Sequence, residues 1–168
     1  MKSLIAFYSR TGGNSMNGEI KNIKKGNTEI VAETLQELTG GEVYRIYPQE
    51  EYPQDYEQCV LRAQKESEQN IHPTIKNPLS SISDYDVIYV GFPLWFRSYP
   101  RIIATFFDCF DFTGKIIKPF CTNEEGSFGI AELEMRTTLK DATVKDGISF
   151  HGFELDDVKS RLEKWIEK

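Results

Sequence analysis

Cysteine and histidine are scarce in this chain of 168 residues, which contains three cysteines and two histidines. Cys59, Cys109 and Cys121 share no short spacing, so the sequence favours neither a disulfide framework nor a zinc site. His72 and His151 have no second histidine or carboxylate at metal-ligand spacing, which favours surface or packing roles for both. We therefore expect no resident metal.

The chain also lacks an excess of basic residues. It has 20 Lys and Arg against 26 Asp and Glu, a formal net charge of −6. A nucleic-acid partner would need a basic excess on one face to neutralise its phosphates, so we expect none. No apolar run approaches membrane-spanning length, and the first run is too short for a signal peptide. These absences predict a cytoplasmic protein with no membrane partner.

What the chain does have is the composition and patterning of a folded domain. Apolar residues make up 39% and charged residues 27%, and the length suits one domain, residues 1–168. Apolar patterning predicts strands at residues 2–8, 42–47, 87–90, 116–121 and 143–150. It predicts helices at residues 28–38, 55–69, 100–110, 131–139 and 155–166.

This alternation of strands and helices predicts an α/β fold with a mainly parallel sheet covered on both faces. Ligands in such folds bind beyond the carboxyl ends of the strands, where the strand order reverses. The loops after the first, third and fourth strands are therefore the candidate ligand loops. They are Ser9–Thr28, Phe92–Tyr99 and Thr122–Gly129.

The first loop carries the groups of a phosphate-binding nest. It supplies hydroxyls from Ser9, Thr11 and Thr28 and an amide from Asn27, next to a helix start. Helix N-termini offer an anion unpaired N–H groups and the positive end of a dipole. The loop lacks the lysine of the pattern G-x-x-x-x-G-K-[ST], which favours a phosphomonoester over a triphosphate with its metal. The alternative is an ordinary loop in which Thr28 only caps the helix.

The second loop is unusually aromatic, and the third is polar. Phe92, Trp95, Phe96 and Tyr99 lie near the end of the third strand, where rings can pack against a planar ligand. The alternative places Phe92 and Phe96 in the core or in a dimer contact. Residues 122–129, TNEEGSFG, suit hydrogen bonds to the edge of a heterocycle, but polar loops commonly follow strands.

In this order along the chain, the three loops resemble those of the flavodoxin family over nearly the whole sequence. The likeness is strongest to the short-chain, flavodoxin-like FMN oxidoreductase branch. It rests on YSRTG at residues 8–12 with GNT at 26–28, and on GFPLWF at residues 91–96. It rests further on DFTGK at residues 111–115 and PFCT at 119–122, which discriminate better than the phosphate loop.

The resemblance implies a three-layer sandwich with a five-stranded parallel sheet of order 2-1-3-4-5 and non-covalently bound FMN. Residues that correspond to Ser9, Thr11, Asn27 and Thr28 hold the FMN phosphate in that family. The resemblance assigns the isoalloxazine ring to Pro93, Leu94, Trp95 and Phe96, and its polar edge and the ribityl chain to Thr122, Asn123, Gly126 and Ser127. Arg10 and Arg97 are further expected contacts. The chemistry then belongs to the flavin, and no side chain need act as a general acid or base.

The chain departs from the family pattern in two places. Residues 13–26 interrupt the phosphate loop, and the Asn17-Gly18 turn signal predicts that they form a small hairpin or a flap over the phosphate. Residues 96–99, FRSY, replace a stretch in which relatives tend to have a second tryptophan and a glycine. Arg97 there either attracts a pyridine-nucleotide phosphate or an anionic substrate, or is simply solvated.

We expect an FMN-binding redox protein that transfers electrons to a partner protein or a small acceptor, as a monomer or a homodimer. An NAD(P)H-dependent reductase of quinones or other small acceptors is the alternative. Glu124 and Glu125 are either solvated or, beside a flavin, disfavour an anionic reduced ring. A flavin-free interaction or signalling module on the same fold is the alternative of another class. Receiver domains share the strand order, but Ser9-Arg10 and Gly91-Phe92 stand where those have acidic residues.

Overall fold

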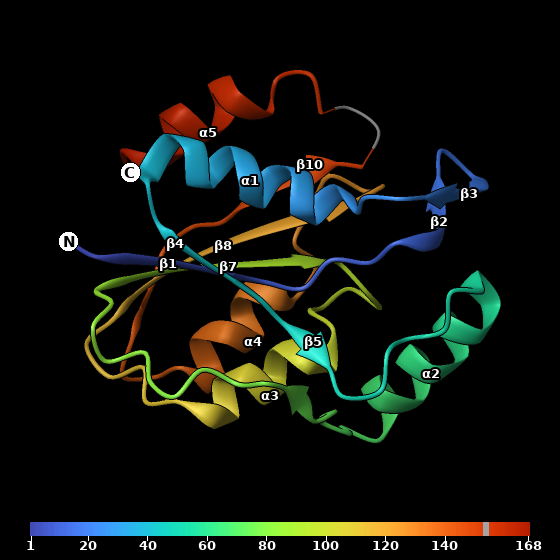
Figure 1. The fold of residues 1–168 in the computed structure, drawn as a ribbon, viewed down its shortest axis with the longest axis horizontal. Coiled ribbons are helices and arrows are strands. Elements are labelled where there is room, and N and C mark those ends of the chain that lie inside the picture. The colour runs from blue at the N-terminus through green and yellow to red at the C-terminus, as the bar shows by residue number, and fades with distance from the viewer. Residues whose placement is uncertain (153–154) are drawn as a thin grey trace.

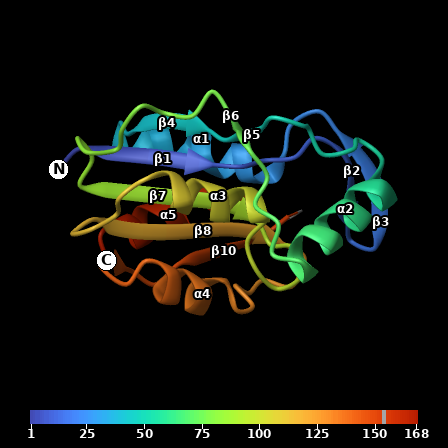
Figure 2. The ribbon, with the colours of Figure 1, turned by 90° about the horizontal axis from the view of Figure 1, so that it is seen from below.

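Five parallel strands form the centre of the molecule in the computed structural model, which describes residues 1–152 and 155–168. The strand order is β10-β8-β7-β1-β4, and Figure 2 shows the strands in this sequence. These strands are β4 (Glu42–Arg45), β1 (Ser3–Phe7), β7 (Val87–Pro93), β8 (Ile116–Asn123) and β10 (Ile148–His151). Numbered along the chain, this is the predicted order 2-1-3-4-5, so the predicted fold class is confirmed.

The central strands form because their apolar runs are continuous. β1, β7 and β8 are buried along almost their whole length, as expected for parallel strands covered on both faces. β7 and β8 run farther than predicted, to Pro93 and Asn123. Pro93, Thr122 and Asn123 therefore lie on strand ends rather than in loops, and the sheet itself fixes their positions.

The fifth predicted strand, residues 143–150, is divided in the structure. β9 (Thr143–Val144) and β10 both pair with β8, and the segment between them lies opposite Pro119. Proline has no backbone N–H to offer a neighbouring strand. Gly147 passes so close that a Cβ there would lie 2.8 Å from the Pro119 carbonyl oxygen. Pro119 and Gly147 thus interrupt a pairing that the apolar pattern alone predicted as continuous.

Helices cover both faces of the sheet (Figure 1). α1 (Asn27–Thr39) and α5 (Val158–Ile166) pack on one face through Val31, Leu35 and Leu162. α3 (Arg101–Cys109) and α4 (Ala131–Thr138) pack on the other through Phe106 and Met135. α5 begins at Val158, later than the predicted Leu155.

The remaining elements gather beyond the carboxyl ends of the strands. β2 (Gly12–Met16) and β3 (Glu19–Ile23) form an antiparallel hairpin whose turn is Asn17-Gly18, with φ of 55° and 76°. The predicted hairpin is therefore confirmed. Figures 1 and 2 both place it beside α2 (Tyr56–Glu68), whose N-cap Asp55 accepts a hydrogen bond from the Gln58 N–H at 2.9 Å. The short strands β5 (Tyr47–Pro48) and β6 (Ile75–Lys76) pair with each other.

Candidate functional site

The phosphate loop that the hairpin interrupts is closed by Ser9. Its Oγ accepts a hydrogen bond from the backbone N–H of Glu29 at 3.1 Å and so caps α1, whose own N-cap residue, Gly26, has no side chain. A Cβ on Gly26 would lie 2.1 Å from Ser9 Oγ, so this approach requires glycine. The two halves of the loop are therefore in direct contact, and the hairpin projects from their junction.

The predicted phosphate ligands differ in their surroundings. Ser9 and Thr28 are buried, and Thr28 Oγ1 lies 2.9 Å from Thr122 Oγ1. Thr11 and Asn27 are partly exposed. Because α1 begins at Asn27, its first backbone N–H groups have no acceptor within the helix. The buried hydroxyls therefore shape the loop, and Ser9 takes the Glu29 N–H, while the N–H groups before Glu29 and the Asn27 side chain remain for an anion.

The aromatic loop after β7 is held in one shape by backbone hydrogen bonds. Leu94 N–H donates to the Thr122 carbonyl at 3.0 Å, and Trp95 and Ser98 exchange bonds of 2.8 and 3.0 Å. The turn between them places Phe96 and Arg97 at φ of 50° and 64°. Two successive non-glycine residues in this region cost about 1–3 kcal/mol each, a kind of strain that concentrates at ligand sites.

The rings of this loop have separate roles. Trp95 packs edge-on against Tyr8 and Tyr52, with ring centroids 5.5 and 5.0 Å apart, so these two rings fix its position. Phe92 is fully buried, which confirms the core alternative for that residue. Phe96 is 47% exposed and is not part of the core.

The polar loop after β8 is organised by the side chain of Asn123. Its Oδ1 accepts hydrogen bonds from the N–H groups of Glu125 and Gly126 at 2.7 and 2.5 Å. Its Nδ2 donates to the Ser127 carbonyl at 2.7 Å. Asn123 thus directs its polar atoms inward to the loop, and the backbone beside it forms the rim of the site.

A cavity of about 300 Å³ lies where the three loops meet. We call it the central cavity. Its lining includes six of the predicted site residues: Asn27, Pro93, Leu94, Trp95, Thr122 and Asn123. The other predicted residues lie outside the lining: Ser9, Arg10, Thr11, Thr28, Phe96, Arg97, Gly126 and Ser127. Arg10 and Phe96 instead line a neighbouring cavity.

Sequence reasoning missed six residues of the lining as site residues: Asn14, Ser15, Tyr56, Glu124, Glu125 and Gly152. Asn14 and Ser15 come from the hairpin, and Tyr56 comes from the first turn of α2. The Asn17-Gly18 turn predicted a hairpin or a flap over the phosphate, so the sequence did contain a signal that pointed to these hairpin residues. Tyr56 and Gly152 follow no ligand-like motif, and only the tertiary structure brings them to the site.

Glu124 is one of two carboxylates, with Glu125, that line the central cavity. Ser15 Oγ donates to Glu124 Oε2 at 3.0 Å, which links the hairpin to the polar loop. The other oxygen, Oε1, is buried and has no hydrogen-bond partner among the described residues. A buried acceptor without a donor is costly, so a ligand N–H at this position would be stabilised.

Cys121, at the base of the same region, is not a nucleophile at neutral pH. Burial raises the pKa of its thiol to about 12, so the unreactive protonated form prevails. No metal-binding group of His, Cys, Asp and Glu side chains occurs in the described ranges, 1–152 and 155–168. Within the same ranges, no helix has the length and apolar character needed to cross a membrane.

A sequence model of the flavodoxin family matches residues 2–168. A candidate flavoprotein from Bacteroides uniformis has 29% sequence identity and a TM-score of 0.78, with 99% of this chain and 98% of that chain covered. A candidate flavoprotein from Bacteroides eggerthii has 28% identity and a TM-score of 0.80, covering 99% and 96%. A Lactobacillus acidophilus flavoprotein in complex with FMN has the same fold at 22% identity, with a TM-score of 0.66 and 98% of each chain covered. No curated protein matches the chain.

Proposed function

Because the chain belongs to the flavodoxin family, we propose that it binds FMN non-covalently in the central cavity and transfers electrons through it. The first backbone N–H groups of α1 and the Asn27 amide would hold the phosphate. Leu94 and Trp95 would pack against the ring, and Thr122 and Asn123 would lie along its polar side. FMN supplies the electron or hydride transfer when bound, and the protein supplies position and electrostatics.

The observation that carries this proposal is the place of the central cavity in the fold. It lies at the carboxyl ends of β7 and β8 and beside the start of α1, which the β2–β3 hairpin connects to β1. The sheet order reverses between β1 and β7, and ligands of doubly wound folds bind at that point. A helix N-terminus, an aromatic wall and a polar wall meet there, as a phosphate-bearing heterocycle requires.

Glu124 provides the test of fit within this structure. Its buried Oε1 is an acceptor without a donor, and the isoalloxazine ring carries an N–H on its polar edge. The aromatic wall is fixed before binding, since Trp95 rests on Tyr8 and Tyr52. The residues present therefore suit FMN.

A reductase of small acceptors with NAD(P)H as donor is the second candidate function. It is favoured by the neighbouring cavity, which shares Leu94 and Trp95 with the central cavity. A pure electron carrier for a partner protein would show little turnover with NAD(P)H, whereas a reductase would bleach rapidly and then reoxidise with a quinone.

We propose a cytoplasmic location for the protein with either function, because a reducing compartment suits its three free thiols.

The absorption spectrum of the purified protein tests the proposal directly. We expect flavin bands, and FMN released on denaturation. Asn27→Ala should weaken FMN binding by roughly tenfold, the scale of one lost hydrogen bond to a charged group. Asn22→Ala is the control, because Asn22 is exposed on β3 and outside the cavity lining. A colourless protein that takes up no FMN at micromolar concentration would instead indicate the flavin-free module.

A further inference from the structure

A second cavity of about 230 Å³, which we call the side cavity, adjoins the central one. Its apolar walls come from Val60 and Ala63 of α2 on one side and from Leu94, Trp95 and Phe96 on the other. α2 stands beyond the end of the sheet rather than on its face, as Figure 2 shows, and this placement brings α2 opposite the aromatic loop. Two aromatic and three aliphatic side chains form walls that suit a flat, apolar ligand.

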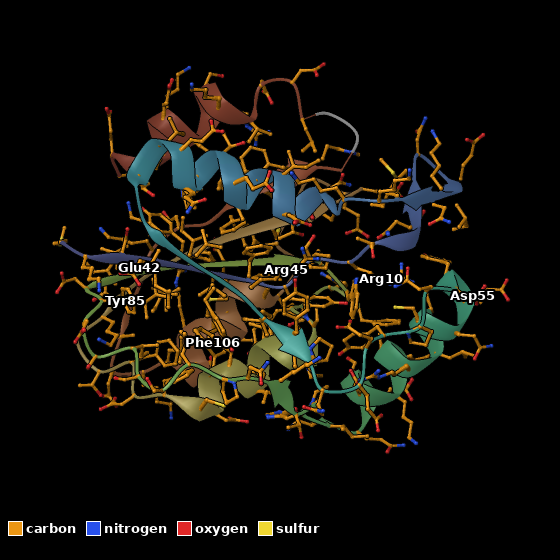
Figure 3. The ribbon with its side chains drawn as sticks, in the orientation of Figure 1. Arg10, Glu42, Arg45, Asp55, Tyr85 and Phe106 are labelled. Atoms are coloured by element: carbon orange, nitrogen blue, oxygen red, sulfur yellow. The ribbon has the colours of Figure 1, made fainter. Side chains whose placement is uncertain are left out.

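The polar part of the side-cavity wall centres on Arg10. This side chain is only 7% exposed, and its guanidinium donates to the carbonyls of Gly13, Pro53 and Gln54, the latter two at 2.7 and 3.1 Å. Figure 3 shows Arg10 near the start of α2, where Asp55 is labelled. Each of these acceptors is an uncharged backbone group, and the Cys59 thiol is a further uncharged partner, so among the described residues no carboxylate pairs with the buried positive charge.

Arg10 keeps unused hydrogen-bonding capacity. Its Nε is buried and meets no acceptor in residues 1–152 and 155–168. The neighbouring Cys59 thiol does not supply a counter-charge, because burial raises its pKa and the thiol stays protonated at neutral pH. A buried cation without a charged partner favours an electron-rich oxygen nearby. Asn14, from the hairpin, adds a polar amide to the same lining.

We propose that the side cavity binds a small, planar, conjugated ring that carries carbonyl oxygens, that is, a one-ring or two-ring quinone. The ring would lie between Val60 and the Leu94–Phe96 wall, with a carbonyl oxygen toward Arg10 and Asn14. The cavity volume of about 230 Å³ suits one or two fused rings. Binding itself does not require FMN, whereas use of the ligand as an electron acceptor rests on the proposed function.

Calorimetric titration of the full chain with tetramethyl-1,4-benzoquinone tests this site. The fully substituted ring cannot add protein thiols, so the heat reports reversible binding. Tetramethylbenzene, which has the same ring and methyl groups but no carbonyl oxygens, is the matched ligand. We expect it to bind at least roughly tenfold more weakly, since it leaves Arg10 without an acceptor.

Val60→Phe fills the side cavity from α2, and because Val60 is only partly buried the helix should keep its packing. We expect this variant to lose quinone affinity by about tenfold or more, while its FMN affinity stays at the wild-type value. Leu61→Phe is the matched control, because Leu61 is the next residue of α2 and is 59% exposed. It should bind both ligands as the wild type does.

Three outcomes overturn the side-cavity proposal: absence of quinone binding, equal quinone affinity in Val60→Phe, or complete displacement of the quinone by FMN. The last would place the quinone in the central cavity. If the chain binds the quinone in a Val60-dependent way but takes up no FMN, the side-cavity proposal is supported and the FMN proposal fails. The two failures are therefore distinguishable.

Discussion

Asn123 and Ser9 show how single residues build the central cavity. Both lie at the carboxyl end of a strand, and both use their polar atoms to satisfy backbone groups of neighbouring segments. Glu124 differs, because one of its carboxylate oxygens is bound by Ser15 and the other is buried without a partner. At the residue scale, the loops are therefore fixed largely by satisfied side chains, while Glu124 and Arg10 each keep a buried polar atom without a partner among the described residues.

Glu124 should lower the reduction potential of bound FMN, because its negative charge disfavours added electrons in a partly buried site. We expect Glu124→Gln to raise the potential by on the order of 50 mV for a one-electron step, measured by equilibrium dye titration. Glu125→Gln is the comparison, since Glu125 is exposed and solvent screens its charge. Equal shifts in the two variants would contradict a special role for Glu124.

Two elements shape this site: the inserted β2–β3 hairpin and the strained turn after β7. The β2–β3 hairpin brings Asn14 and Ser15 to the central cavity, although residues 13–26 separate the halves of the phosphate loop in the sequence. The turn after β7 carries Phe96 and Arg97 at positive φ, where glycine or asparagine is the usual choice. It is braced by the Ile130 N–H, which donates to the Arg97 carbonyl at 2.7 Å. At the element scale, surrounding contacts hold a turn that its own sequence disfavours.

Replacing Arg97 by glycine should relieve part of this strain. We expect Arg97→Gly to raise the free energy of unfolding by about 0.5–1 kcal/mol, after the entropy cost of glycine is subtracted. Arg97→Ala removes the same charge but keeps a Cβ, so it should leave stability near the wild-type value. Urea denaturation with comparison of midpoints and slopes measures both. Similar stabilisation in the two variants would assign the effect to charge rather than to the backbone.

The whole molecule buries several titratable groups in the core on one face of the sheet. Tyr8, Tyr52, Cys59 and Cys121 belong to that core, and burial raises the pKa of each above its ordinary value. All four are therefore protonated and neutral at neutral pH, so the core buries no charge on them. These four groups destabilise the folded state only at alkaline pH, where the unfolded chain can release their protons and the folded chain cannot.

Cys121 sets a measurable part of this pH dependence. Its thiol has an ordinary pKa of 9.0 and a folded pKa of about 12, so its contribution to stability is complete below pH 9 and declines above it. From about pH 9 toward pH 12 the loss from this group approaches about 1.4 kcal/mol per pH unit. We expect Cys121→Ala to be less stable at pH 7 but to lose stability less steeply above pH 9, in denaturation measured at several pH values. Parallel curves for the two proteins would rule out the thiol as the cause.

The sequence predicted the strands and the loops of the site because these depend on local patterns, and the strand order followed from the family resemblance. Continuous apolar runs in β1, β7 and β8 identified the buried strands, and the segments at residues 91–96 and 119–122 carried the family resemblance. The interruption of the last strand escaped this reasoning, because it arises from the contact between Gly147 and Pro119 on neighbouring strands. A pattern along one strand contains no information about the partner across from it.

What the sequence determined by itself is the doubly wound fold and the edge of the sheet where we propose that FMN binds. Apolar periodicity and turn residues act within a few positions of each other, so they can be read without coordinates. Only the tertiary structure decided which polar groups reach the cavity, turning Arg10 toward the carbonyls before α2 and bringing Tyr56, Glu124 and Gly152 to the lining. The reason is physical: a buried polar side chain goes to whichever partner the packed chain places within hydrogen-bond distance, and that partner is usually distant in sequence.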